Sequence, residues 1–373
     1  MFQRIRTSRL YHRVCCFVLF FVTASASFNG FYEKWQFGEP LVPNDINKFG
    51  IDLMLDGTAY RPFVYRQLLP NAANWIEAIV PRRFEDWMYV HQGSGPNAYI
   101  TAIADSPIAR NKVYFFRYLV VYIATFLFAL LAVYAMYLVC RALEIPPPAA
   151  VFAPVIIILL LPYIMSIGGY FYDYSELAFL ALAVWIAIRF DWWWVIPVAV
   201  LGTWNKESFL MFVPTLYPFL RCRRSRPGAL LCVAGLCLVC AAIYYSMRLQ
   251  FVNNPGSTLE VHWSEQLQSF LHPGALLFST EESYGVRGIR VLSVVPMALL
   301  IWTVRRGWPR LPRVIQRHGQ IAAAINVPLY LLFCAPGELR NLSMLYIAFL
   351  VVLAVNLNDW ICSSGQAGSL QTG

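Results

Sequence analysis

Charge is scarce in this sequence. Of its 373 residues, 13% are charged and 59% are hydrophobic, whereas a soluble domain has about 25% charged residues. Apolar runs such as 149–167 and 229–245 are too continuous for the amphipathic helices of a soluble surface. The composition therefore excludes an ordinary soluble domain and predicts an all-α polytopic membrane protein.

The sequence also lacks the common cofactor motifs. Its nine cysteines show no zinc spacing, and none lies in the long loops predicted below, so no disulfide framework is expected. No glycine-rich nucleotide-binding loop is present. The energy for any reaction is therefore expected to come with an activated substrate, such as a lipid-linked donor.

The net charge of +9 does not indicate a nucleic-acid partner, because the arginines gather in short connections between apolar runs. These positions are 4, 6, 9 and 13, then 221, 223, 224 and 226, then 305, 306, 310, 313 and 317. Such clusters mark the cytoplasmic side of a membrane protein. Lysine is almost absent from these connections, which is typical of a GC-rich bacterial genome, so we expect a bacterial inner membrane protein. With the arginine clusters on the cytoplasmic side, both of its termini are expected to be cytoplasmic.

The apolar runs predict about ten transmembrane helices. Their approximate limits are 14–30, 114–140, 149–169, 175–190, 192–204, 208–220, 228–247, 289–304, 321–336 and 341–358. They make one transmembrane domain over 1–358, with extracytoplasmic loops at about 31–113 and 248–288 and a short cytoplasmic tail over 359–373. The first run resembles a signal peptide, but we expect an uncleaved span because apolar character resumes at Phe28.

Four polar segments interrupt the apolar runs, and the predicted topology places all of them on the extracytoplasmic side. They cover 52–70, 170–176, 205–208 and 337–341. Charged groups at the edge of hydrocarbon are costly and commonly mark a functional site. Four such segments on one face predict a single active site there.

The first long loop offers a general base and a phosphate-binding group. Asp52 and Asp56 are four residues apart and would share one face of a helix, where a recessed carboxylate can act as a base. Arg61, Tyr65 and Arg66 combine guanidinium groups, which grip phosphate, with an aromatic ring that can stack on a sugar or a prenyl chain. The alternatives are a helix cap for either aspartate and interfacial snorkelling for the arginines.

The other segments carry further candidate site residues, namely Asp173, Glu176, Asn205, Lys206, Glu207, Glu338 and Arg340. An aromatic belt explains the tyrosines beside Asp173 but not its carboxylate or that of Glu176. Lys206 with Glu207, and Glu338 with Arg340, can also be read as local pairs that only neutralise each other.

These motifs resemble the GT-C class of integral membrane glycosyltransferases, in particular bacterial members of unassigned substrate. The resemblance covers about 50–358. It rests on an early acidic residue in the first loop, the run 65–70, the triplet 205–207 and the triplet 338–340.

The resemblance implies an inverting enzyme whose donor is a polyprenyl-phosphate sugar and whose acceptor is an extracytoplasmic glycan, lipid or protein. Asp52 or Asp56 would be the base. Arg61, Tyr65, Arg66, Lys206 and Arg340 would bind the donor phosphate. Asp173, Glu176, Asn205, Glu207 and Glu338 would orient the acceptor or a divalent cation such as Mg or Mn.

Two features depart from the pattern of the class. The adjacent acidic pair of the first loop, Glu85 and Asp86, comes late in that loop, and no large soluble C-terminal domain follows the last span. Three alternatives stay open: a polysaccharide polymerase or ligase, a lipid or solute transporter, and a structural scaffold. A transporter would place its site near the middle of the membrane, whereas the charges here lie at one rim.

Overall fold

The structure is a computed structural model that describes residues 9–37, 48–91, 103, 106–166, 168–272, 274 and 280–369. It is helical apart from one β-hairpin. The longer helices are α2 (Arg9–Trp35), α7 (Lys112–Ala142), α8 (Pro147–Ile164), α9 (Tyr172–Arg189), α13 (Arg226–Gln250), α16 (Val294–Gly307), α17 (Arg313–Phe333) and α18 (Tyr346–Ser369). The shorter helices are α3 (Ile51–Leu55), α4 (Leu68–Ile79), α5 (Arg82–Val90), α6 (Pro107–Arg110), α10 (Val195–Asn205), α11 (Phe209–Phe212), α12 (Tyr217–Arg223) and α14 (Trp263–Leu271).

Among the described residues, five helices are long and apolar enough to cross a membrane. They cover Tyr11–Trp35, Lys112–Ala142, Pro147–Ile164, Arg226–Gln250 and Leu339–Ser363. These helices indicate an integral membrane protein. The other predicted spans are also helical, but two of them, α10 with 11 residues and α16 with 14, are shorter than the roughly 20 residues that hydrocarbon requires.

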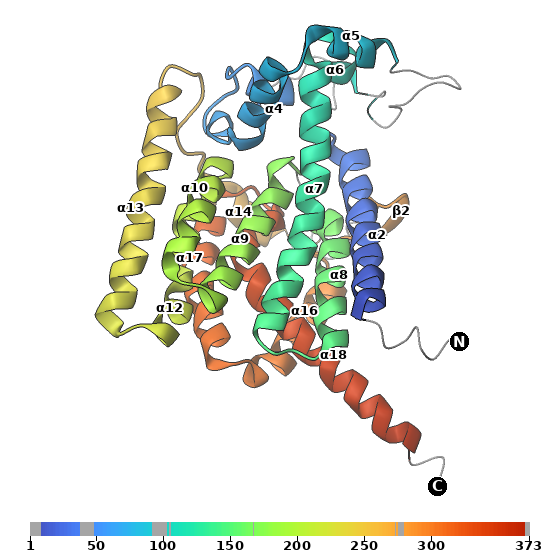
Figure 1. The fold of residues 1–373 in the computed structure, drawn as a ribbon. Helices are drawn as coiled ribbons and strands as arrows, with labels where there is room; N and C mark the ends of the chain where they lie inside the picture. Colours follow the sequence, from blue (N-terminus) through green and yellow to red (C-terminus); the bar gives the residue numbers. More distant parts are fainter. Residues whose placement is uncertain are drawn as a thin grey trace.

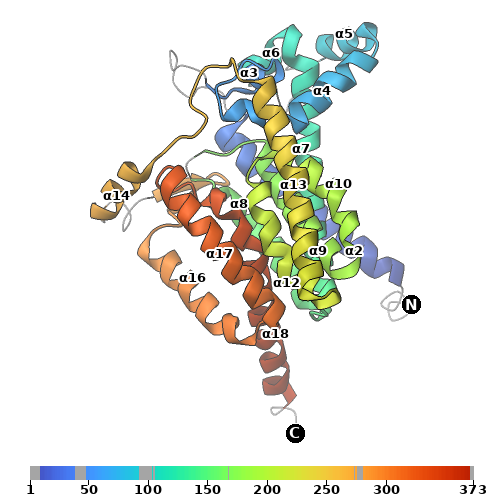
Figure 2. The same ribbon diagram turned by 90° about the vertical axis from the view of Figure 1, so that its left-hand side faces the viewer.

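The helices form a bundle with one decorated end (Figure 1). Helices α2, α7 and α8 pack on one another, α7 also packs on α9, and α13 packs on α10 at the far edge. Helices α16, α17 and α18 lie together on one side (Figure 2). Helices α3–α6 lie at the end of the bundle where α2 finishes and α7 starts (Figure 1), and we call this the cap end.

Prolines divide the predicted span 208–220 into three pieces. The chain forms α11, a 3-10 helix over Val213–Leu216 and α12, and each of the last two has a proline in its first turn, Pro214 and Pro218. Proline lacks an N–H and clashes with the preceding turn, so it is accommodated most easily where a helix begins. This segment is therefore a broken helix and not one continuous span.

The cap-end terminus of α8 is completed by side chains from other elements. Pro162 has no N–H, so it leaves the carbonyl of Ile158 without its helical partner, and Ser27 Oγ of α2 donates to that carbonyl at 2.6 Å. Trp35 Nε1 donates to the carbonyl of Met165 at 2.8 Å, and Tyr284 Oη donates to that of Leu159 at 2.7 Å. Backbone polar groups inside hydrocarbon need such internal partners.

Tyr284 belongs to the β-hairpin of β1 (Thr280–Ser283) and β2 (Val286–Ile289), in which Ser283 pairs with Val286. Tyr284 and Gly285 both adopt positive φ, 58° and 66°, as a two-residue type I′ turn requires. The tyrosine ring lies against Gly30 of α2, where an added Cβ would come within 2.7 Å of it. The all-α prediction did not include this hairpin.

The two predicted long loops are joined at the cap end. Asn254 Nδ2 donates to the carbonyls of Gly57 and Ala59 at 2.8 and 3.0 Å. In return, the backbone N–H of Arg61 donates to the carbonyl of Pro255 at 2.9 Å. Helix α18 continues to Ser369, beyond the limit of 358 predicted for the last span.

Candidate functional site

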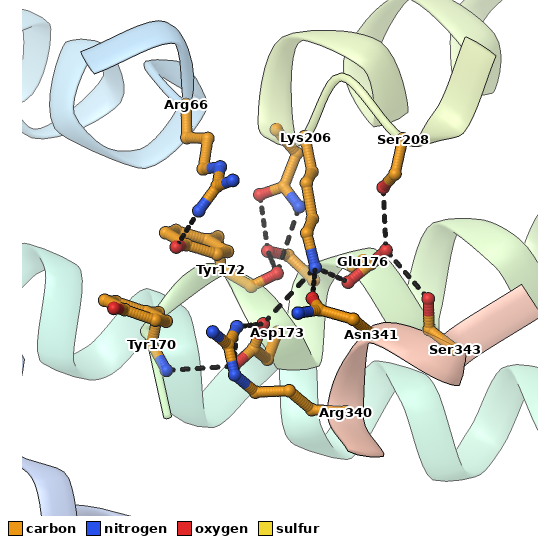
Figure 3. Close-up of polar contacts among 12 residues, drawn as sticks. Arg66, Tyr170, Tyr172, Asp173, Glu176, Lys206, Ser208, Arg340, Asn341 and Ser343 are labelled. Atoms are coloured by element: carbon orange, nitrogen blue, oxygen red, sulfur yellow. Dashed lines mark hydrogen bonds and ion pairs between the residues drawn. The ribbon is translucent and has the colours of Figure 1, made fainter. Parts of the chain in front are cut away.

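Seven charged side chains from four separate segments meet where α9 begins and α10 ends (Figure 3). We call them the ionic network: Arg66, Asp173, Glu176, Lys206, Glu207, Glu338 and Arg340. Asp173 lies in the first turn of α9, Glu176 follows three residues later, and Lys206 caps the last turn of α10. The placements of Asp173 and Lys206 are favourable, because a helix dipole stabilises anions at its start and cations at its end.

Lys206 is the centre of the network. Its ammonium group lies 2.7 Å from Glu176 Oε2, 3.1 Å from Asn341 Oδ1 and 3.8 Å from Asp173 Oδ1. The side chains of Lys206, Asp173 and Glu176 are at most 5% exposed. A buried ammonium with acceptors on three sides keeps its charge and holds α9, α10 and the segment after α17 together.

Arg340 connects two of the carboxylates. Its Nη1 donates to Asp173 at 3.2 Å, and its Nη2 donates to Glu338 at 3.0 Å. Glu338 in turn accepts from the backbone N–H of Ala335 at 3.1 Å. The guanidinium also lies 4.4 Å from the centre of the Tyr170 ring, a cation–π contact that adds to its orientation.

Arg66 brings the first loop onto the bundle. Its Nη2 and Nε donate to the two oxygens of Glu207 at 3.0 and 3.3 Å, and its Nη1 donates to the Tyr172 hydroxyl. The guanidinium lies 4.7 Å from the centre of the Tyr172 ring, which stacks on Tyr170 at 5.1 Å. The two rings and the two arginines therefore form one column across the site (Figure 3).

Neutral side chains satisfy the remaining acceptors of the network. Glu176 Oε1 accepts from the hydroxyls of Ser208 and Ser343, each at 2.9 Å. Asn205 accepts from the hydroxyl of Ser175 at 2.5 Å and donates to the carbonyl of Tyr172 at 3.0 Å. Asn205 is therefore a structural link between α9 and α10.

We call the side of the network formed by Arg66 and Glu207 its open side. Their side chains are 11% and 27% exposed, compared with 18% for Glu338 and 5% for both Lys206 and Arg340. Burial opposes ionisation of Glu207, but the nearby Arg66 outweighs it and holds the pKa of that carboxyl below its ordinary value. Glu207 is thus a charged acceptor at neutral pH, and it is the most exposed member of the network.

The two aspartates predicted as a base belong to a different neighbourhood. Asp56 caps the end of α3 and accepts from Tyr114 Oη at 2.6 Å and from Arg117 Nη1 at 3.2 Å, both from the first turns of α7. Asp52 lies one turn earlier in α3, and the Asp56 N–H donates to its carbonyl at 3.1 Å. None of the contacts described above joins either carboxylate to the ionic network.

Arg61 and Tyr65 have local roles. The two terminal nitrogens of Arg61 donate to the carbonyls of Val252 and Gly256 at 3.2 and 2.7 Å, so this guanidinium joins the two loops. Tyr65 is buried, and its ring meets that of Tyr244 edge-on at 6.5 Å. The structure thus brings Arg66, Lys206 and Arg340 together and leaves Arg61 outside their network.

The sequence interpretation missed Arg117, which lies inside the predicted span 114–140. Besides binding Asp56, it pairs with Glu77 of α4 at 3.4 Å and thereby fixes the cap to α7. A charged residue inside an apolar run is itself a signal, and it was present in the sequence. Ser208 and Ser343 carried no such signal, because serine is common at helix ends.

A divalent cation has no evident ligand set in the described part of the chain. No group of three or more His, Cys, Asp or Glu side chains is arranged there to hold a metal ion. The network carboxylates each contact a lysine or an arginine instead.

Comparisons with protein-family models, with curated proteins and with solved structures return no match to this chain.

Proposed function

We propose that this protein is an integral membrane glycosyltransferase of the GT-C class with ten membrane-spanning helices, including the shorter and broken ones. It would reside in a bacterial inner membrane with its termini in the cytoplasm and its cap end outside. The donor would be a polyprenyl-phosphate sugar, and the acceptor a glycan, lipid or protein hydroxyl at the outer surface.

The observation that carries the proposal is the position of Arg66. It comes from the first loop, is the most exposed of the three network cations, and lies beside the two more deeply buried ones. A guanidinium has five N–H donors, and the contacts with Glu207 and Tyr172 use three of them. The others are available to a phosphate oxygen, with Lys206 and Arg340 adding positive potential behind it.

In the proposed reaction, a first-loop aspartate takes the proton of the acceptor hydroxyl. The oxygen attacks the anomeric carbon, the bond from that carbon to the phosphate oxygen breaks, and polyprenyl phosphate leaves with the electron pair. Asp56 Oδ1 and Oδ2 are held by Arg117 and Tyr114, and its side chain is 38% exposed. A substrate bridging this aspartate and Arg66 would extend over the surface of the cap.

A second candidate function is transport of a lipid or solute. The specific observation in its favour is that all three network cations are already neutralised by carboxylates. An anionic donor would have to displace or share at least one carboxylate, whereas a transporter can use such pairs to hold one of its two conformations.

The deciding experiment is a donor-dependence assay on protein reconstituted in lipid. Mixed prenyl-phosphate sugars are supplied and release of prenyl phosphate is followed for wild type, Asp52→Asn, Asp56→Asn and the control Asp86→Asn. Asp86 lies on the same loop but pairs with the exposed Lys112. We expect one of the first two variants to lose about 100-fold or more of the rate while the control keeps it.

The other outcomes of this assay are equally informative. A wild-type protein that releases no prenyl phosphate from any donor would contradict the proposal and favour the transporter. Full activity in both aspartate variants would keep the transferase and move the base to another carboxylate, with Glu207 the first to test.

A further inference from the structure

Helix α14, in the second long loop, has an apolar stripe that the described part of the chain leaves exposed. Trp263, Leu267, Phe270 and Leu271 are between 47% and 67% exposed, and we call them the α14 apolar face. Their spacing of four, three and one residues places them on one side of a helix. Leu259 and Val261, just before the helix, are also exposed and extend this surface.

The helix is fixed to the bundle by polar contacts. The backbone N–H of His262 donates to the carbonyl of Leu332 at 2.9 Å, and Gln266 Nε2 donates to that of Cys334 at 3.0 Å. Within α14, Gln266 is the one buried side chain. The contacts that orient this helix are thus hydrogen bonds to the end of α17, and hydrophobic packing against the bundle does not account for its apolar stripe.

The position of α14 along the bundle is set by its hydrogen bonds to the carbonyls of Leu332 and Cys334. They lie at the end of α17, a few residues before Glu338 and Arg340 of the ionic network. Leu332 itself is 40% exposed and Val327 is 39% exposed, so the neighbouring surface of α17 is apolar too. In Figure 2, α14 projects sideways from the bundle beside the end of α17.

We propose that α14 is an interfacial helix that lies in the bilayer surface at the cap end, with the α14 apolar face among the acyl chains. Its opposite side carries Ser264, Glu265 and Gln268, which are exposed and suited to the headgroup region and water. Trp263 stands at one end of the face, and tryptophan is enriched at that depth of a membrane.

The bilayer is the partner that these features favour. A helix that projects sideways at the rim of an apolar bundle meets lipid before any other surface. Helix α14 also packs on α17, which itself has exposed apolar side chains at Val327 and Leu332. Because the same two hydrogen bonds tie α14 to the segment leading to Glu338, the helix sets the depth of the ionic network relative to the lipid surface. This inference does not depend on the reaction proposed above.

Two neighbouring positions give a matched test of which side faces lipid. Leu267→Cys lies on the α14 apolar face, and Gln268→Cys lies next to it on the polar side. Each variant is reconstituted in vesicles with a water-soluble maleimide on both sides of the membrane, and labelling is followed by peptide mapping so that native cysteines do not interfere. We expect about tenfold or slower labelling at 267 than at 268.

A second measurement uses the unchanged protein. Vesicles containing a phospholipid with a photoreactive group in its acyl chain are irradiated, and adducts are mapped, with α13 as the positive control because much of its apolar surface is exposed. We expect adducts on the peptide containing 263–271. Equal labelling at 267 and 268, or adducts on α13 with none on α14, would overturn the proposal and indicate water or a protein partner at this face.

Discussion

Lys206 and Lys112 each hold a carboxylate oxygen at 2.7 Å, yet their surroundings differ completely. Lys206 and Glu176 are at most 5% exposed, whereas Lys112 and Asp86 are more than half exposed. Exposed pairs are screened by water and contribute little. Removing one partner of a buried pair leaves an uncompensated charge.

This contrast gives the first prediction. Lys206→Met leaves Glu176 buried without its cation, whereas Asp173 keeps Arg340, so we expect the free energy of unfolding to fall by about 3–5 kcal/mol. Lys112→Met should leave stability unchanged within error. Denaturant titration of both variants in the same lipid or detergent measures the difference, and similar losses in the two would mean that burial of the network contributes nothing.

The Arg66–Glu207 pair predicts a pH dependence. The folded-state pKa of Glu207 lies below its ordinary 4.5, so ionised Glu207 stabilises the fold. That contribution is complete above about pH 4.5 and is lost as the pH falls through the lowered pKa. The stability advantage of wild type over Glu207→Gln should therefore be constant near neutral pH and shrink in acid. A stability difference between wild type and Glu207→Gln that grows as the pH falls would contradict the lowered pKa.

At the residue scale, the sequence predicted the seven charged residues that gather in the ionic network. It also placed Asp56 and Arg61 with them, and it did not indicate the partner of any. Arg66, Lys206 and Arg340 were recognised because charges beside apolar runs are costly. Arg61, five residues before Arg66, carried the same signal but binds two backbone carbonyls. That difference depends on the fold of 251–256, which no local pattern indicates.

At the scale of elements, the end of α8 shows how a proline is accommodated in an apolar helix. Ser27 Oγ supplies the hydrogen bond that Pro162 cannot give to the carbonyl of Ile158. Ser25, two residues earlier in α2, donates at 2.8 Å to the carbonyl of Phe21, within a regular stretch of the same helix. The hydrogen bond from Ser27 is thus needed to satisfy a carbonyl that lacks a backbone donor, whereas the one from Ser25 goes to a carbonyl inside a regular helix.

Ser27→Ala and Ser25→Ala therefore form a matched pair. The first leaves a buried carbonyl without a partner, and we expect it to lower the free energy of unfolding by about 1–3 kcal/mol. The second should have little effect, because a carbonyl inside a helix keeps its backbone partner. Thermal unfolding of both variants measures this, and equal melting temperatures would show that the Ile158 carbonyl finds another donor.

Apolar runs located the long helices well, because their signal is local. Departures occur where a contact with a distant element decides the structure. The hairpin of β1 and β2 is held by Tyr284 against Gly30 and Leu159, and its own strands of four residues are too short to be evident in the sequence. The breaks at Pro214 and Pro218 were visible in the sequence and were overlooked.

At the scale of the molecule, the joined loops make the cap one unit. Gly256 adopts φ of 93°, and an added Cβ would lie 2.7 Å from the carbonyl oxygen of Arg61. Gly288 in the hairpin provides a control, because an added Cβ there meets no atom within 4 Å.

Gly256→Ala should separate the two loops, at a cost of about 1–3 kcal/mol. The backbone N–H of Arg61, which donates to Pro255, should then exchange with solvent about tenfold faster or more. Gly288→Ala should leave that amide unchanged. Hydrogen exchange with peptide mapping gives both rates, and equal protection of Arg61 in the two variants would contradict the close contact between the loops.

The proposed function requires the ionic network to bind a substrate as well as to hold the helices together. Exchanging the charges of Arg66 and Glu207, at its open side, separates substrate binding from stabilisation of the fold. The double variant Arg66→Glu with Glu207→Arg keeps an ion pair between these two positions. Its guanidinium, the proposed phosphate-binding group, then comes from position 207 and no longer from the first loop.

The decisive measurement is prenyl-phosphate release by this double variant, made beside its thermal stability. We expect stability close to wild type and, since the cation at the leaving group is displaced, transfer reduced about 100-fold or more. A double variant that is stable and transfers sugar at the wild-type rate would show that Arg66 and Glu207 serve the fold alone.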